Sequence, residues 1–231
     1  MLNRSRRIFT GSPARRTSKA SPMPSTADTA LLVIDVQNDF CPGGALAVGD
    51  GDGVLPLVND LIARFEHVVL TQDWHPAGHS SFASSHDGAA PFSVMAMAYG
   101  AQTLWPDHCI QGTRGAEFHA GLRSTRAELV VRKGFRTAID SYSAFFENDR
   151  KTPTGLAGYL RERGLSRVVL AGLATDFCVA YSALDARRLG FETAVAIDAC
   201  RAIDLDGSLA AAQKLMREAG VGLTTSAGVA A

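Results

Sequence analysis

The chain has 231 residues, of which 46% are hydrophobic, enough for one large folded domain with a substantial core. Its 23 basic and 23 acidic residues balance, but six of the basic ones precede the first acid, Asp28. The rest of the chain therefore holds 17 bases against 23 acids, a net charge of −6, which argues against nucleic acid as a partner. No apolar run is long enough to span a bilayer, so we expect no membrane partner either.

The first 27 residues differ in composition from the rest of the chain. They are rich in Ser, Arg and Pro and show almost no apolar periodicity. We therefore expect residues 1–27 to be a disordered basic extension and residues 28–231 to form a single domain. A transit peptide, or a reading frame that truly starts at Met23, remains an open alternative. The four cysteines form no C-x-x-C pair and no signal peptide precedes them, which predicts free thiols and a cytoplasmic location.

Short apolar runs alternate with helical patterns along the folded part. An apolar run bounded by turn-forming residues is typical of a buried parallel strand, and apolar residues three or four apart indicate a helix. The expected strands are 30–35, 67–71, 129–131, 168–172, 193–197 and 221–223. The expected helices are 54–65, 156–163, the stretch that follows Thr175-Asp176, and 209–218. This alternation predicts a three-layer α/β/α fold around a mostly parallel sheet of about six strands.

Reactive side chains stand where three of these strands end. Asp35 ends the first strand, Lys133 closely follows the strand at 129–131, and Cys178 follows the strand at 168–172. Ligands of open parallel sheets bind beyond the carboxyl ends of the strands, so these residues should gather along one edge. A carboxylate, an ammonium and a thiol there could form an activated nucleophile. Taken singly, Asp35 is equally typical of a turn cap and Lys133 of a surface charge.

The surroundings of Cys178 suggest a reactive thiol. Thr175 and Asp176 are residue types that cap helix N-termini, which would place Cys178 in the first turn of a helix. Free N–H groups and the helix dipole favour a thiolate at that position. A small buried hydrophobe and a redox-sensitive thiol are the alternatives.

A second kind of chemistry follows the strand at 67–71. Asp73 and His75 lie on the same side of an extended segment, and His79, His86 and His108 follow in a long loop-rich region. Two imidazoles and one carboxylate with open positions suit Zn²⁺ or Fe²⁺, with Mn²⁺ as a further candidate. The spacing does not separate direct ligands from supporting histidines.

Five segments in order resemble nicotinamidases, enzymes of the isochorismatase-like cysteine hydrolase superfamily. They are DVQNDF (35–40), DWHP (73–76), WPDHC (105–109), KG (133–134) and GLATDFCV (172–179). Any one of these segments is weak evidence of a resemblance, but five in order at suitable separations are specific evidence. The similarity runs from about Leu31 to the last expected strand. The resemblance implies the isochorismatase-like hydrolase fold. It also implies hydrolysis of nicotinamide, and of pyrazinamide, in a pathway that returns the pyridine ring to NAD.

The resemblance further implies roles for individual residues. Cys178 is similar to the nucleophile, with Asp35 and Lys133 completing a triad. The implied metal ligands are Asp73, His75 and His108, with His79 as an additional ligand or a supporting residue. The implied walls around the pyridine ring are Phe40, Trp105 and Tyr142. A non-proline cis peptide between Leu173 and Ala174 would aim the Ala174 N–H, together with that of Cys178, at the substrate oxygen.

Some features leave alternatives open. The segment between His79 and Trp105, around Ser93–Tyr99, is longer than in the shortest family members; it could cover the site or contact a second copy in a homo-oligomer. A carbamoyl or ureido amidase of the same superfamily would share the triad, although the implied metal ligands argue against it. A non-catalytic metal-binding protein on this fold is the rival from another class.

Overall fold

The computed structural model describes residues 26–229, so residues 1–25 of the expected extension lie outside the described part. Six strands form one sheet in the order β5-β2-β1-β6-β7-β8, and each neighbouring pair is parallel. The strands are β1 (Thr29–Ile34), β2 (His67–Asp73), β5 (Leu129–Lys133), β6 (Arg167–Leu173), β7 (Glu192–Arg201) and β8 (Gly222–Thr224). The parallel six-stranded sheet predicted from the sequence is confirmed.

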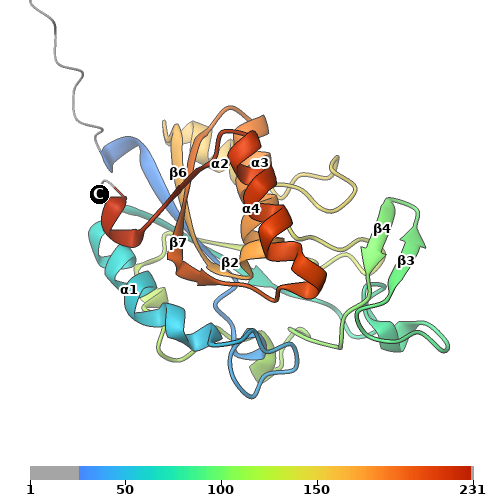
Figure 1. Cartoon of the computed structure of the whole chain (residues 1–231). Coiled ribbons are helices and arrows are strands. Elements are labelled where there is room, and N and C mark those ends of the chain that lie inside the picture. Colours follow the sequence, from blue (N-terminus) through green and yellow to red (C-terminus); the bar gives the residue numbers. More distant parts are fainter. Residues whose placement is uncertain (1–25, 230–231) are drawn as a thin grey trace, which may run out of the picture.

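Helices cover both faces of this sheet. Within residues 26–229 the α-helices are α1 (Leu55–Arg64), α2 (Leu156–Glu162), α3 (Ala180–Arg188) and α4 (Ser208–Glu218). Helices α3 and α4 pack side by side, and α1 lies on the other side of the strands (Figure 1). Every residue of the central strand β1 is buried, which explains its continuous apolar sequence. The three-layer α/β/α architecture is therefore confirmed.

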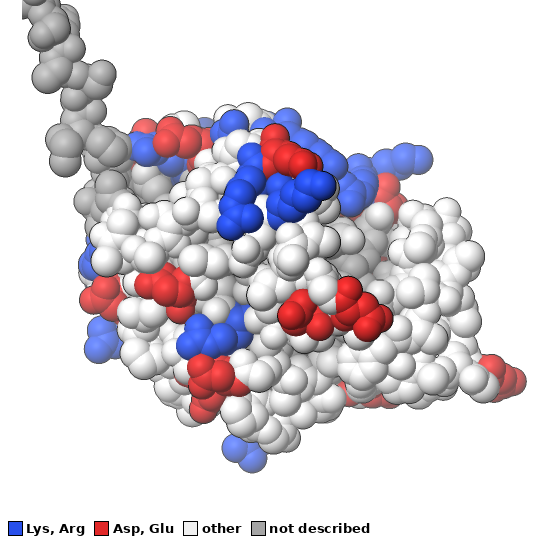
Figure 2. Space-filling model, viewed as in Figure 1, with Lys and Arg blue, Asp and Glu red and all other residues white. Residues whose placement is uncertain are grey.

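The visible surface is mixed in charge. Figure 2 shows small groups of Lys and Arg beside small groups of Asp and Glu, separated by broad uncharged areas. No helix within the described range is both long and apolar enough to cross a membrane. All four cysteines are buried free thiols, as expected.

The strand order explains why the reactive residues converge. Strands β5, β2, β1 and β6 are neighbours, and the register pairs Asp73 with Lys133 at the carboxyl ends of β2 and β5. Asp35 directly follows β1 with a left-handed φ of 47°. The segment that carries Cys178 directly follows β6. Since parallel strands present their carboxyl ends at one edge, four consecutive strand ends meet there.

The long region between β2 and β5 contains a hairpin that the sequence did not predict. Its strands β3 (Val94–Met97) and β4 (Gly100–Thr103) pair in antiparallel fashion and lie away from the body of the molecule (Figure 1). The hairpin includes most of the extended segment around Ser93–Tyr99. Half of the residues in these strands are exposed, and the sequence VMAM of β3 is apolar throughout, so the apolar and polar alternation that marks a half-buried strand is missing.

The start of the Cys178 helix also differs from the expectation. Thr175–Val179 form a π-helical turn that leads into α3, and Ala174 occupies the N-cap position without a side-chain cap. The carboxylate of Asp176 instead accepts hydrogen bonds from the backbone N–H groups of Ile203 and Asp204. The N-cap interpretation of Thr175 and Asp176 was therefore wrong, because the Asp176 carboxylate is used to secure the chain before α4.

Candidate active site

Asp35, Lys133 and Cys178 meet in a buried cluster at the carboxyl edge of the sheet. The Nζ atom of Lys133 lies 2.8 Å from Oδ2 of Asp35 and 3.5 Å from Sγ of Cys178. It also donates to Oδ1 of Asp73 at 2.9 Å and to the carbonyl oxygen of Ser141 at 3.0 Å. Cys178 is the most accessible of the three, at 7% exposure. The lysine thus links the carboxylates to the thiol.

Strand β2 orients the Asp35 carboxylate. Oδ1 of Asp35 accepts a hydrogen bond at 2.6 Å from the hydroxyl of Thr71, which lies on β2. The Asp35 N–H donates to the same hydroxyl at 3.1 Å. Oδ2 lies 2.8 Å from the Lys133 ammonium and forms an ion pair with it. An ionised carboxylate oxygen of this kind keeps a lone pair free to accept a proton.

Burial controls the protonation of this cluster. Burial raises the pKa of Asp35 above its ordinary value, although the Lys133 ammonium acts in the opposite direction. Burial also raises the pKa of the Cys178 thiol well above its ordinary value, and Lys133 offsets this only in part. For Lys133, burial acts against the charged form, but the carboxylates of Asp35 and Asp73 dominate and raise its pKa. Burial thus opposes the thiolate that a helix N-terminus would favour at Cys178.

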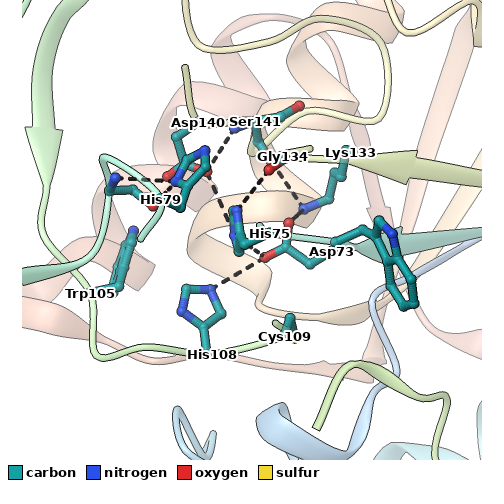
Figure 3. Close-up of polar contacts among 12 residues, drawn as sticks. Asp73, His75, His79, Trp105, His108, Cys109, Lys133, Gly134, Asp140 and Ser141 are labelled. Carbon is teal, nitrogen blue, oxygen red and sulfur yellow. Dashed lines mark hydrogen bonds and ion pairs between the residues drawn. The ribbon is translucent and has the colours of Figure 1, made fainter. Parts of the chain in front are cut away.

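Asp73, His75 and His108 face one another beside this cluster (Figure 3). Oδ2 of Asp73 lies 3.1 Å from Nε2 of His75 and 3.3 Å from Nε2 of His108. Ligands about 2.0–2.2 Å from one divalent ion lie roughly 2.8–3.6 Å apart at octahedral or tetrahedral angles. Both distances from Oδ2 of Asp73 fall within that range.

Backbone carbonyls orient the two imidazoles. Nδ1 of His75 lies 2.9 Å from the carbonyl oxygen of Gly134, and Nδ1 of His108 lies 2.8 Å from that of Pro106. Because a carbonyl oxygen can only accept, each Nδ1 carries a hydrogen, and each ring turns its Nε2, the nitrogen available to a cation, toward Asp73. The donor set and its hydrogen bonds therefore fit a divalent cation.

His79 lies next to this group but uses both ring nitrogens elsewhere. Its Nδ1 accepts from the backbone N–H of Ser81 at 3.1 Å, and its Nε2 lies 2.9 Å from the carbonyl oxygen of Arg136. The ring packs against His75 with the centroids 4.4 Å apart. This arrangement suits a supporting histidine better than a direct ligand. His86 contacts the backbone carbonyl of Ser80 and does not belong to the group of Asp73, His75 and His108.

A cavity lined by Cys178, Asp73 and His108 connects the thiol with the Asp-His group. Its aromatic walls include all three of the expected pocket residues, and a fourth aromatic residue that was not predicted; these are Phe40, Trp105, Tyr142 and Phe177. The Trp105 indole N–H donates to the Tyr142 hydroxyl at 3.0 Å, which fixes two of the walls. Ala174 and Cys178 also line the cavity, and the Leu173–Ala174 peptide is cis, as the resemblance implied.

Comparison with known proteins decides the family. The model of the isochorismatase domain matches residues 29–228. The chain belongs to the isochorismatase family. A nicotinamidase of Acinetobacter baylyi is 53% identical to it over 199 residues, which cover 86% of this chain and 93% of the relative. The resemblance to nicotinamidases read from the five segments is thereby confirmed.

Solved structures of this family place the same fold around small ligands. The Acinetobacter baumanii nicotinamidase/pyrazinamidase is 55% identical with a TM-score of 0.86, covering 87% of this chain and 97% of its own. PnC1 of L. infantum, solved with nicotinate, is 39% identical with a TM-score of 0.78, covering 89% and 96%. The pyrazinamidase of Pyrococcus horikoshii, solved with zinc, is 35% identical with a TM-score of 0.70, covering 86% and 99%.

Sequence reasoning missed several polar residues of this isochorismatase-family site. Gln37 is fully buried, and its side-chain amide pairs with both the N–H and the carbonyl of Asp73 at 2.8 Å. This two-point contact holds the backbone of a candidate ligand. Asp140, which lines the cavity, was missed as well. Gln37 lies within the segment DVQNDF, and Asp140 lies two residues before Tyr142. Their closeness in sequence to predicted site residues was therefore the signal that could have identified them.

Gly134→Ala tests whether the His75 ring depends on its glycine neighbour. Gly134 has a φ of +68°, and a Cβ there would lie 2.5 Å from Cε1 of His75. We expect the substitution to displace the ring and lower the zinc content of the purified protein several-fold, as measured by elemental analysis. Gly164→Ala is the matched control, because Gly164 has a φ of +72° but nothing within 4 Å of its Cβ position. Equal zinc content in the two variants would show that the contact of the new Cβ with the His75 ring has no effect of its own on zinc binding.

Proposed function

We propose that this chain is a metal-dependent cysteine amidohydrolase that converts nicotinamide to nicotinate and ammonia. The observation that carries the proposal is the Asp35–Lys133–Cys178 cluster, which shares one aromatic-lined cavity with the Asp-His group. The nicotinate-bound and zinc-bound relatives support both the ligand and the ion. We extend the proposal to pyrazinamide as a second substrate, to Zn²⁺ or Fe²⁺ (with Mn²⁺ as a further candidate), and to NAD salvage in the cytoplasm.

Proton transfer from Cys178 to Asp35 starts the reaction. The thiol has a raised pKa, so Sγ attacks the amide carbon as its proton passes to the carboxylate, whose own pKa is raised toward that of a useful base. Lys133 stays charged and stabilises the negative charge on sulfur as it develops. The three groups act as one unit because the lysine contacts both of its partners.

Backbone N–H groups would hold the oxygen of the tetrahedral intermediate. Ala174 and Cys178 supply the candidates, since both line the cavity. Removing one donor of such a pair typically raises the barrier by about 2.7–4 kcal/mol. Asp35 then returns the proton to the departing ammonia, which leaves a thioester on Cys178. Water, deprotonated by the same carboxylate, releases the acid and restores the thiol.

The walls of the cavity position the flat ring for this attack. Phe40 and Trp105 offer aromatic surfaces, while Tyr142 is held by its hydrogen bond from Trp105. When bound at Asp73, His75 and His108, a divalent cation would supply a Lewis acid for the ring nitrogen. Holding the carboxamide at a fixed distance from sulfur removes much of the entropic cost of the attack.

The decisive experiment measures ammonia release from nicotinamide, before and after chelation of the protein. We expect rapid release, its loss after chelation, and recovery on addition of Zn²⁺ or Fe²⁺. Release from a carbamoyl or ureido compound but not from nicotinamide would favour the related amidase. Tight metal binding without release from any of these amides would favour a non-catalytic protein.

A further inference from the structure

We infer that the carboxylate of Asp140 belongs to the cation site as an outer group that strengthens ion binding, and that Gln102 of the β3–β4 hairpin holds it there. The inference rests on the proposed cation site of Asp73, His75 and His108. Neither Asp140 nor Gln102 lies in the five segments that carry the family resemblance. Each is buried, at 2% and 1% exposure respectively.

Asp140 approaches the nitrogen of His75 that faces the candidate ion. Its Oδ1 lies 3.9 Å from Nε2 of His75, the same atom that lies 3.1 Å from Asp73. Asp140, His75 and His79 form a second group of potential ligands that shares His75 with the first (Figure 3). A separation of 3.9 Å is too long for a direct hydrogen bond, so the Asp140 carboxylate lies near this nitrogen without bonding to it. The carboxylate therefore lies beside the cation site without being one of its nearest donors.

The balance of buried charge indicates why a carboxylate stands there. Three buried carboxylates, those of Asp35, Asp73 and Asp140, lie in this part of the molecule, and the Lys133 ammonium pairs with two of them, Asp35 and Asp73. Among the described residues no Lys or Arg pairs with Asp140, whose other contacts are neutral donors. Buried charges are costly unless they are paired or lie beside a metal. A divalent cation bound beside Asp140 would supply the positive charge that no Lys or Arg among the described residues provides there.

Gln102 fixes the direction of the Asp140 carboxylate. Its Nε2 lies 2.8 Å from Oδ2 of Asp140 and 2.8 Å from the hydroxyl of Tyr142. Its Oε1 accepts from the side-chain amide of Asn148 at 3.1 Å and from the hydroxyl of Tyr99 at 3.2 Å. Because an amide oxygen cannot donate, these partners define which end of the side chain faces the carboxylate. Gln102 is thus a positioning residue.

This contact assigns a role to the long segment before Trp105. Half of the residues in the two hairpin strands are exposed, but Gln102 in β4 turns inward and reaches two residues that line the cavity. An isolated two-stranded hairpin is only marginally stable in water, so these buried hydrogen bonds should also anchor it. The hairpin therefore contributes to the cation site through one side chain.

The test is the zinc affinity of the full-length protein, measured by competition with a chelator and independently of turnover. We expect Asp140→Asn to weaken zinc binding roughly 10- to 100-fold, the range typical of outer partners of a metal site. Gln102→Met should weaken it less, since the carboxylate charge remains. The double variant should bind zinc no more weakly than Asp140→Asn alone, because both substitutions remove the same contribution.

Matched controls separate this effect from a general loss of charge or stability. Asp60→Asn removes an exposed carboxylate of α1, and Gln213→Met removes an amide on α4; both should leave the affinity within about twofold, as expected for surface positions. If Asp140→Asn does not fold, Gln102→Met carries the test, with the thermal unfolding of the zinc-free protein as a check.

Four outcomes would overturn part or all of these proposals. Parent-like zinc affinity of folded Asp140→Asn would remove Asp140 from the cation site. Independent, additive losses in free energy from the two substitutions would show that Gln102 does not act through Asp140. If the parent and His75→Ala bind zinc equally weakly, the proposed cation site itself fails. If His75→Ala loses zinc while Asp140→Asn keeps it, only the present inference fails.

Discussion

Cys178→Ala should abolish nicotinamide hydrolysis while leaving the zinc content near that of the parent. The sulfur is the attacking atom in the proposed reaction, and loss of a nucleophile that acts within a triad costs at least about 10⁴-fold in turnover. Zinc should stay bound because the Asp-His group does not include Cys178. The measurement pairs a steady-state ammonia assay with elemental analysis of the same preparation.

Another buried thiol provides the control for that result. Cys200 lies on β7, is free, and is not among the residues that line the cavity. Cys200→Ala should therefore keep activity close to that of the parent, apart from any loss of folded protein. Substantial turnover by Cys178→Ala, at a rate that no trace of parent enzyme explains, would remove the thiol from the mechanism.

Lys133→Met should lower both activity and stability. The ammonium is fully buried and lies 2.8 Å from Asp35 and 2.9 Å from Asp73, so its removal leaves two buried carboxylates without their partner. Breaking a buried ion pair in this way costs about 3–5 kcal/mol in the free energy of unfolding. Turnover should fall as severely as in Cys178→Ala, because the thiolate loses its counter-charge. Urea unfolding and the ammonia assay measure the two effects.

The pH dependence of that stability loss provides a further check. The unpaired carboxylates of Lys133→Met should have raised pKa values in the folded state. Protonation then restores stability in acid, and the loss relative to the parent should grow as the pH rises. Lys214→Met is the control, since Lys214 makes only an exposed pair with Glu218, worth about 0–1 kcal/mol. A stability loss no larger than that of the control would mean that the buried charges are compensated in another way.

Much of the fold was predictable because a strand that is buried on both faces has a continuous apolar sequence. The apolar run of β1 needs little context to be read as a central parallel strand. The meeting of Asp35, Lys133 and Cys178 was predictable for a related reason, since all three follow or end strands whose carboxyl ends share an edge. The register that pairs Asp73 with Lys133 was not predictable, because it depends on strand order.

Other features depend on tertiary contacts that no local pattern encodes. Gln102 and Asp140 are 38 residues apart, and only the folded hairpin brings the amide to the carboxylate. Asp176 has the side chain of an N-cap residue, but its carboxylate is used 27 residues further along the chain. The raised pKa of Cys178 arises first from burial, which depends on the folded structure and leaves no local pattern in the sequence.

The most direct measurement of the central claim is a search for the covalent intermediate. Protein mixed with nicotinamide is quenched in acid within a single turnover, and its peptides are analysed by mass spectrometry. The account predicts a nicotinoyl group on the peptide that contains Cys178, formed before nicotinate appears and absent in Cys178→Ala. Nicotinate that accumulates while Cys178 remains unmodified, or an acyl group on a different residue, would contradict it.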